Sequence, residues 1–135
     1  MNVKQAVPFF MVADMQAALA FYVDGLGFRV TNTWEPQGFI EWCWLELGGA
    51  AIMLQQYREG KLPTETRGAG VSVCFQCEDA LLLYRDFIAR GLTPKRPFVG
   101  NGMWDVAITD PDGYQLHFES PTDVPEETEY DPAIH

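Results

Sequence analysis

The spacing of apolar residues along this chain alternates between a strand pattern and a helix pattern, and the alternation occurs twice in the same order. Apolar positions recur at helical spacing from Met15 to Leu26 and again from Ala80 to Arg90. An aspartate suited to an N-cap, Asp14 or Asp79, precedes each stretch. The pattern predicts two helices at equivalent places in a repeated unit.

Strands are predicted on both sides of each helix by runs of alternating or continuous apolar residues bounded by glycine and proline. The predicted strands cover residues 7–12, 28–31, 40–47 and 50–57 in the first half, and residues 71–76, 93–98, 103–109 and 114–119 in the second. A hairpin turn is predicted at Asp110–Gly113, because proline suits its second position and glycine its left-handed position. The order of strand, helix and three strands predicts a duplicated α+β module with two halves related by a pseudo-twofold axis.

The length of 135 residues suits one domain built from two half-domains. Residues 58–69 are rich in glycine, proline and charged side chains, and we expect them to link the two halves. The longest nearly apolar run, Ala6 to Ala13, is interrupted by Pro8 and is far shorter than the roughly 20 residues that span a bilayer. The N-terminus also has no basic segment followed by a long apolar core, so a soluble cytoplasmic protein with no membrane partner is predicted.

The formal net charge of −10 disfavours a nucleic-acid partner, because phosphate binding needs clustered Lys and Arg side chains. An acidic surface attracts cationic ligands instead. Part of the acidity lies in residues 123–135, which contain five Asp and Glu residues and neither Lys nor Arg. We expect this acidic tail to be solvated and poorly ordered.

Three cysteines, an odd number, argue against a disulfide framework. Cys74 and Cys77 form a CxxC motif, but their odd spacing in a predicted strand places them on opposite faces, which suits neither a shared metal nor a redox turn. The cysteines are therefore interpreted as reduced, buried thiols that act as small core residues.

Several short motifs in a fixed order resemble those of the vicinal oxygen chelate superfamily, which includes glyoxalase I, extradiol dioxygenases, fosfomycin-inactivating enzymes and bleomycin resistance proteins. The motifs, spread over residues 5–121, are Val12-Ala13-Asp14, Ala20-Phe21-Tyr22, Leu26-Gly27-Phe28, Gly48-Gly49-Ala50, Met53-Leu54-Gln55 and Asp110-Pro111-Asp112-Gly113-Tyr114. The resemblance implies two βαβββ modules, residues 1–57 and 70–122, that form a curved mixed sheet around a cleft in a single domain of residues 1–122. It also implies a homodimer.

Metal-dependent members of that superfamily carry ligands at four positions on the first and last strands of the two modules. By resemblance, the equivalent positions here are Val7, Met53, Ser72 and His117. Divalent metals need His, Asp, Glu or Cys donors, and His117 is the one residue of the four that belongs to this set. We therefore expect no metal and no cofactor, and a pattern closest to the metal-free bleomycin resistance branch.

Strand alternation predicts which side chains face the cleft. The predicted apolar wall consists of Val7, Phe9, Met11 and Met53, and the predicted polar wall consists of Ser72, Gln76, His117 and Glu119. The strand residues expected to face the core instead are Ile52, Leu54, Leu116 and Phe118. Such an asymmetric cleft suits an organic ligand with one apolar end and one hydrogen-bonding or cationic end.

Four tryptophans are more than so small a domain needs for its core. Trp34, Trp42, Trp44 and Trp104 are candidates to stack on a planar or cationic ligand, with core or dimer-interface packing as the alternative. Glu41 and Asp105 flank tryptophans and are either complements to a positive ligand or ordinary surface acids.

Two hypotheses of function follow from these observations. The first is a metal-independent protein that binds and sequesters a small aromatic or cationic compound, as in antibiotic resistance. The second is a superfamily enzyme, a lyase, isomerase, transferase or dioxygenase, that uses His117 as a candidate catalytic residue with Glu119, or a metal held in another arrangement. The expected partners are a small-molecule ligand and a second copy of the chain.

Overall fold

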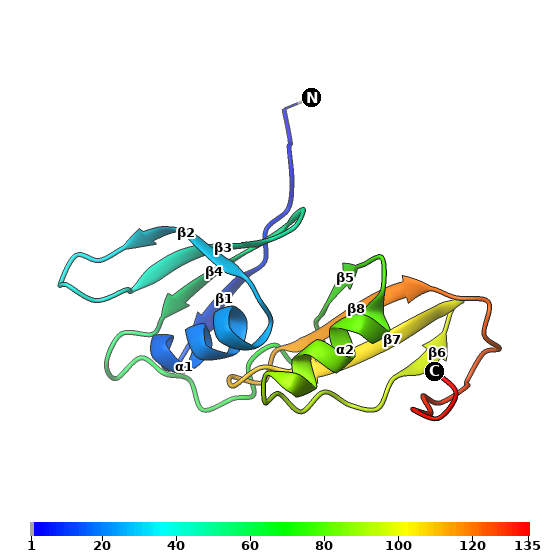
Figure 1. Ribbon diagram of the computed structural model, residues 1–135. Coiled ribbons are helices and arrows are strands. Elements are labelled where there is room, and N and C mark those ends of the chain that lie inside the picture. Colours follow the sequence, from blue (N-terminus) through cyan, green and yellow to red (C-terminus); the bar gives the residue numbers. More distant parts are fainter. Residues whose placement is uncertain (1) are drawn as a thin grey trace. The chain divides into compact units, whose positions relative to one another are not determined.

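The computed structural model describes residues 2–135, and the chain divides after Glu65 into two compact units. Each unit contains a four-stranded mixed sheet with a helix against one face, as the ribbons of Figure 1 show. The α+β class and the repeated order of strand, helix and three strands are therefore confirmed. Among the described residues, no helix is both long and apolar enough to cross a bilayer.

The first unit begins with its shortest strand, which pairs with the last strand of the same unit. Its elements are β1 (Phe9–Val12), α1 (Met15–Leu19), η1 (Ala20–Gly25), β2 (Arg29–Trp34), β3 (Trp42–Leu47) and β4 (Ala50–Gln56). The sheet order is β1-β4-β3-β2, with β1 parallel to β4 and the other pairs antiparallel. The parallel pair requires a crossover, which the helical segment provides.

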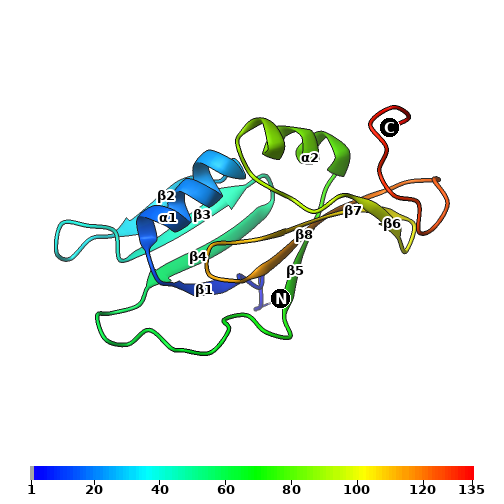
Figure 2. The same ribbon diagram turned by 90° about the horizontal axis from the view of Figure 1, so that it is seen from below.

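The second unit repeats this arrangement strand for strand (Figure 2). Its elements are β5 (Ser72–Gln76), α2 (Ala80–Ala89), β6 (Phe98–Gly100), β7 (Met103–Thr109) and β8 (Gln115–Pro121). The sheet order is β5-β8-β7-β6, again with one parallel pair, β5 with β8. The edge strand β6 starts later than the predicted segment 93–98, because prolines in that segment have no N–H group to donate to a sheet ladder.

The helices of both units start in the same way. Asp14 accepts hydrogen bonds from the Gln16 and Ala17 N–H groups at 2.9 and 3.3 Å, and Asp79 accepts one from the Leu82 N–H at 3.0 Å. These aspartates are the N-caps that the sequence predicted, and they satisfy N–H groups that have no partner within the helix.

The last strand of each unit also caps its helix. The first N–H of α1, from Met15, donates to Gln56 Oε1 at 2.7 Å. The first N–H of α2, from Ala80, donates to Ser120 Oγ at 2.8 Å. Because Gln56 and Ser120 occupy equivalent ends of β4 and β8, the duplication extends to individual hydrogen bonds.

The helix of the first unit differs from its counterpart in its second half. The Leu26 N–H donates to the Phe21 carbonyl at 2.9 Å, and the segment Ala20–Gly25 forms a wider π-helical turn. The predicted helix from Met15 to Leu26 is therefore present, but its last turns are not α-helical. Gly27 follows with φ of 94°, a left-handed conformation that terminates the helix at little cost for glycine.

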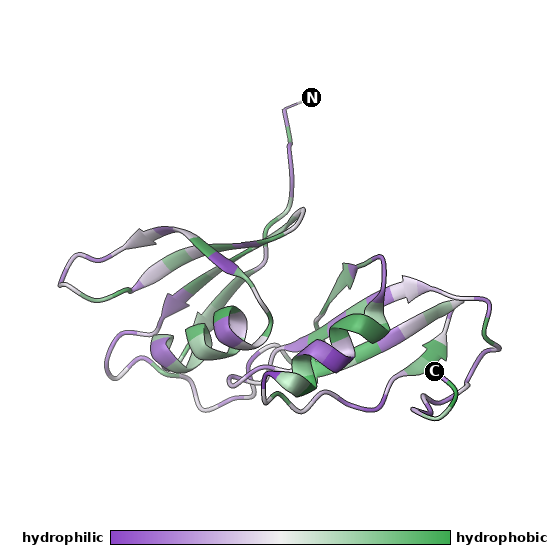
Figure 3. Cartoon of the chain, in the orientation of Figure 1, coloured by the Kyte–Doolittle hydropathy of each residue, from purple (hydrophilic) through white to green (hydrophobic). Residues whose placement is uncertain are grey.

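Apolar residues that alternate along the strands make a separate core in each unit. The predicted core-facing residues Ile52, Leu54, Leu116 and Phe118 are 0%, 0%, 0% and 1% exposed, so that prediction is confirmed. Figure 3 shows the hydrophobic positions along the sheet strands and on the helices. Aromatic rings interlock around them, with the Phe87 and Phe118 centroids 5.0 Å apart.

The predicted turn at Asp110–Gly113 joins β7 to β8. The Asp110 side chain accepts hydrogen bonds from the Asp112 and Tyr114 N–H groups at 2.9 and 2.8 Å, and Gly113 has φ of 101°. Arg67 forms an ion pair with the buried Asp112 at 2.8 Å. These bonds set the hairpin register that pairs Thr109 with Gln115.

Residues 123–135 are folded against the second unit, so the expectation of a poorly ordered tail is wrong. The Val99 N–H of β6 donates to the Thr128 carbonyl at 2.9 Å, which adds the tail to the edge of the sheet. Tyr130 is 7% exposed, and its ring centroid lies 5.1 Å from that of Tyr84. Burial of this aromatic side chain outweighs the solvation of the surrounding acids.

Candidate functional site

The sheet of the first unit presents an apolar surface on the face opposite its buried side chains. We call this surface the aromatic face; it consists of Phe9 and Met11 of β1, Met53 of β4, and Trp34, Trp42 and Trp44 of β2 and β3. Strand register places Phe9 beside Met53 and Met53 beside Trp44, so these three side chains form one row across the sheet. A second row runs from Met11 through Gln55 to Trp42 and Trp34.

Solvent reaches the aromatic face. Phe9 is 48% exposed and Trp34 is 47% exposed, whereas Met53, Trp42 and Trp44 are half-buried. The Trp44 Nε1–H donates to Glu46 Oε2 at 3.0 Å, which orients the indole on this face. Large apolar side chains held in this way offer flat contacts to a planar partner.

The sheet of the second unit presents a polar surface at the equivalent place. This polar face consists of Cys74 and Gln76 of β5, Asp105 of β7, and His117 and Glu119 of β8. Register places Cys74 beside His117 in one row, and Gln76, Glu119 and Asp105 in the next. Four of the five can accept or donate strong hydrogen bonds.

His117 has a carboxylate partner that sequence reasoning did not assign to it. Its Nδ1 lies 2.9 Å from Asp105 Oδ1 and 3.2 Å from Asp105 Oδ2, and the two side chains are 25% and 17% exposed. A carboxylate at Nδ1 holds that nitrogen as the N–H donor and leaves Nε2 as the acceptor in the neutral ring. This geometry can orient an imidazole toward a ligand or a proton.

Cys74 belongs to the same face and is exposed, and Cys77 is half-buried, so the expectation of buried thiols is wrong for Cys74 and holds only in part for Cys77. The pKa of Cys74 is raised above the usual thiol value by desolvation, and further by Glu119 and Asp105 nearby. A raised pKa keeps the thiol protonated at neutral pH and makes it a poor nucleophile. Cys43 is fully buried as expected, and burial raises its pKa to about 11.

The duplication relates the two faces position by position. The pair of Phe9 and Met53 in the first unit corresponds to the pair of Cys74 and His117 in the second. In each pair, one residue of the first strand of the module lies beside one residue of its last strand, at the equivalent position of the parallel register. One module has an apolar pair where the other has a thiol and an imidazole.

Asp105 is a site residue whose contact with His117 the sequence analysis missed, and Cys74 is a second residue of this face that it had interpreted as a buried core thiol. The place of Asp105 next to His117 could have been predicted from the hairpin register. The predicted turn pairs Thr109 with Gln115, which places Asp105 beside Glu119 and diagonal to His117. The contact itself also depends on the side-chain rotamers, which the register alone does not determine.

The remaining predicted site residues lie elsewhere. Val7 precedes β1 and is half-buried, and Ser72 is exposed at the first position of β5. Trp104 is 6% exposed and packs against the tail, with its ring centroid 4.9 Å from that of His135. The structure therefore does not bring Trp104 to the polar face. Within residues 2–135, no cluster of three or more His, Cys, Asp or Glu side chains is arranged to hold a metal ion.

The sequence matches the family model described as the Glyoxalase/Bleomycin resistance protein/Dioxygenase superfamily over residues 4–118. Since this match covers most of the chain, the protein belongs to that superfamily. A comparison with curated proteins found no match.

Solved structures with the same fold include proteins that bind antibiotics. TnmS3, an antibiotic binding protein from Streptomyces sp. CB03234, has a TM-score of 0.67 and 22% identity, covering 90% of this chain and 99% of its own. A bleomycin-binding protein complexed with bleomycin has a TM-score of 0.67 and 21% identity, covering 89% and 100%. A glyoxalase/bleomycin resistance protein/dioxygenase from Nocardioides has a TM-score of 0.66 and 16% identity, covering 97% and 93%. At these identities the likeness concerns the fold.

Proposed function

We propose that this protein binds and sequesters a small aromatic or cationic compound without the help of a metal ion. The observation that carries the proposal is the aromatic face, where Phe9, Met53 and Trp44 form a continuous apolar row that solvent reaches. Contiguous exposed apolar surface on a small soluble domain is typical of a ligand-binding or interaction site. Aromatic side chains favour planar compounds by stacking and cationic ones through their negative ring faces.

The polar face supports the same function from the second unit. His117, Glu119 and Gln76 offer hydrogen-bonding groups and negative charge, which suit a polar or cationic compound. The formal net charge of −10 raises the local concentration of cations near the protein surface.

The donor set supports metal independence. At the positions where the superfamily resemblance implies ligands, Val7 has no lone pair, Met53 has a soft thioether and Ser72 is a weak donor. His117 can donate a lone pair, but divalent ions are commonly held by three or four protein ligands. We therefore assign no metal ion to the site.

The solved structures of similar fold support the binding of a small compound. One is an antibiotic binding protein and another was solved with bleomycin bound, and both share this fold over about nine-tenths of the chain. Sequestration lowers the free concentration of a compound, so it needs affinity and no turnover.

A ligand screen tests this function directly. The panel contains planar aromatic cations, antibiotics including bleomycin, and glutathione adducts, and each is added to protein treated with a chelator. At least one compound is expected to raise the melting temperature and to quench tryptophan fluorescence, because the indoles of the aromatic face lie at the site. Binding that requires an added transition metal would contradict metal independence, and an entirely negative panel would count against small-molecule binding.

The Asp105–His117 pair favours an enzyme as the second candidate function. A histidine oriented by a carboxylate is a common general base, and this pair has a distance of 2.9 Å. Mass spectrometry of each bound compound separates the two functions. Sequestration leaves the compound unchanged, whereas an enzyme converts it, and His117→Asn would then abolish conversion while binding persists.

A homodimer is also proposed, because the aromatic face leaves Phe9 and Trp34 48% and 47% exposed, and a second copy would cover such apolar side chains. Sedimentation at micromolar concentration is expected to give twice the mass of one chain. A single monomeric species at that concentration would contradict the dimer, and it would leave the ligand-binding proposal standing.

A further inference from the structure

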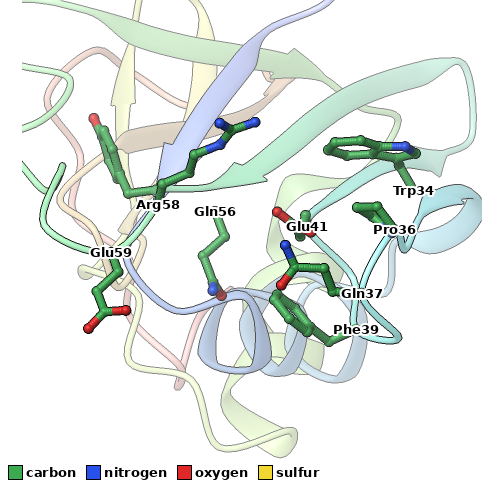
Figure 4. A pocket seen from close by; sticks show the side chains of 9 residues that line it. Trp34, Pro36, Gln37, Phe39, Glu41, Gln56, Arg58 and Glu59 are labelled. Atoms are coloured by element: carbon green, nitrogen blue, oxygen red, sulfur yellow. The ribbon is translucent and has the colours of Figure 1, made fainter.

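A pocket of about 650 Å³ lies wholly within the first unit, at the end of its sheet. The β2–β3 hairpin forms one wall, and the end of β4 with the segment that follows it forms the other. Figure 4 shows the side chains that line it. The volume falls in the range of small-molecule sites in proteins, roughly 300–1,000 Å³.

One carboxylate in this pocket has no hydrogen-bond donor. Glu41 lines the cavity and is half-buried, and its Oε2 is buried without a partner anywhere in residues 2–135. A buried, unpaired carboxylate oxygen destabilises a protein, because it loses its hydrogen bonds to water and forms none within the protein. A buried polar group without a partner is rare in native proteins and calls for an explanation, and a bound group that supplies charge or a donor is one such explanation.

Aromatic side chains line the same pocket as this carboxylate. Trp34, Phe39 and Tyr57 line the same pocket, and Trp34 and Phe39 are 47% and 46% exposed. Their ring faces carry partial negative charge, which attracts ammonium and guanidinium groups. An organic cation could therefore place its charged group near the carboxylate and its apolar part against the aromatic rings of the same pocket.

The charged residues of the lining also favour a cation. The lining contains two acidic residues, Glu41 and Glu59, and one basic residue, Arg58, so it carries net negative charge. Because the carboxylate charge is shared between both oxygens, a cation that approaches Glu41 from the cavity also stabilises the buried Oε2.

We propose that this pocket binds an organic cation that carries a primary ammonium or guanidinium group on an aromatic or aliphatic body. The N–H donors pair with Glu41, and the apolar body lies against Trp34 and Phe39. Of its lining residues, Trp34 alone belongs to the aromatic face, so the inference goes beyond the proposed function and does not depend on it.

The test is a titration of the protein with 2-phenylethylammonium, followed by calorimetry and tryptophan fluorescence. The wild-type protein is expected to bind it, and Glu41→Gln is expected to weaken binding about tenfold or more, because a charge-assisted hydrogen bond is lost. Glu35→Gln is the matched control: Glu35 is an exposed acid of the same hairpin outside the pocket, and its loss is expected to change affinity less than about twofold.

A neutral probe and a melting temperature separate recognition from a structural role of Glu41. 2-Phenylethanol is expected to bind more weakly than the ammonium and to be insensitive to Glu41→Gln. The melting temperature of Glu41→Gln is expected to equal or exceed that of the wild type, because an uncharged amide replaces an unpaired buried carboxylate. A lowered melting temperature with equal loss of both probes would show that Glu41 is structural and would overturn the proposal.

Two further results bear on the site. Failure of 2-phenylethylammonium to bind, or equal weakening by Glu35→Gln and Glu41→Gln, would overturn the cation pocket and leave the proposed function intact. Phe9→Ala, on the aromatic face and outside the pocket, is expected to weaken ligands of that face without affecting 2-phenylethylammonium. Loss of 2-phenylethylammonium binding in Phe9→Ala would instead place the cation on the aromatic face.

Discussion

Replacement of Met53 by glutamate is expected to reduce the affinity of aromatic-face ligands by about a hundredfold or more. Met53 stands in the middle of the row between Phe9 and Trp44. A bound ligand would remove water from the new carboxylate and provide no donor for it, at a cost of several kcal/mol. The measurement is a fluorescence titration with a compound identified in the screen.

Met53→Leu is the control for this prediction. Leucine has a similar volume and no charge, so binding is expected to stay within a few-fold of wild type. Apolar surroundings also raise the pKa of the carboxyl group that Met53→Glu introduces, so affinity is expected to recover in part as the pH falls and the carboxyl becomes neutral. Met53→Glu that binds like the wild type at neutral pH would place the ligand elsewhere.

Deletion of residues 123–135 is expected to lower the free energy of unfolding of the protein by roughly 3–5 kcal/mol. The tail contributes Tyr130, which is 7% exposed, and its removal uncovers Trp104, which is 6% exposed in the intact protein. It also removes the carbonyl that accepts the Arg96 Nε–H at 2.7 Å. Urea denaturation of the truncated and intact chains measures the difference.

Single substitutions identify which part of the tail is responsible. Tyr130→Ala is expected to reproduce most of the loss, because the ring fills a space between Tyr84 and Trp104. Glu129→Gln removes an ion pair with Arg96 whose partners are 67% and 59% exposed, and such surface pairs contribute at most about 1 kcal/mol. A truncated chain as stable as the intact one would refute the structural role of the tail.

The order of elements was predictable because it depends on local interactions. Helical spacing, aspartate caps and the turn at Asp110–Gly113 act within a few residues, and each was found where the sequence placed it. The division of strand residues into core-facing and open positions also follows from alternation along a single strand, as the buried Leu54 and Phe118 show.

The contacts of the candidate site were harder to predict. The pair of His117 and Asp105 is a diagonal contact between β8 and β7, so it needed both the hairpin register and the rotamers. The π-helical end of the first helix is a second example, because its sequence pattern does not differ visibly from that of a regular helix.

The amino-acid sequence by itself determined the duplicated α+β module, the membership of the superfamily and the faces of the strands, because periodicity, capping and turn chemistry are local properties of the chain. Only the tertiary structure decided that Tyr130 anchors an acidic tail, that Cys74 is exposed beside His117, and that Glu41 is left without a donor in a pocket. The physical reason is that the burial of a side chain and its hydrogen-bond partners depend on segments that are distant in the sequence. Local sequence patterns do not show which of these segments come together.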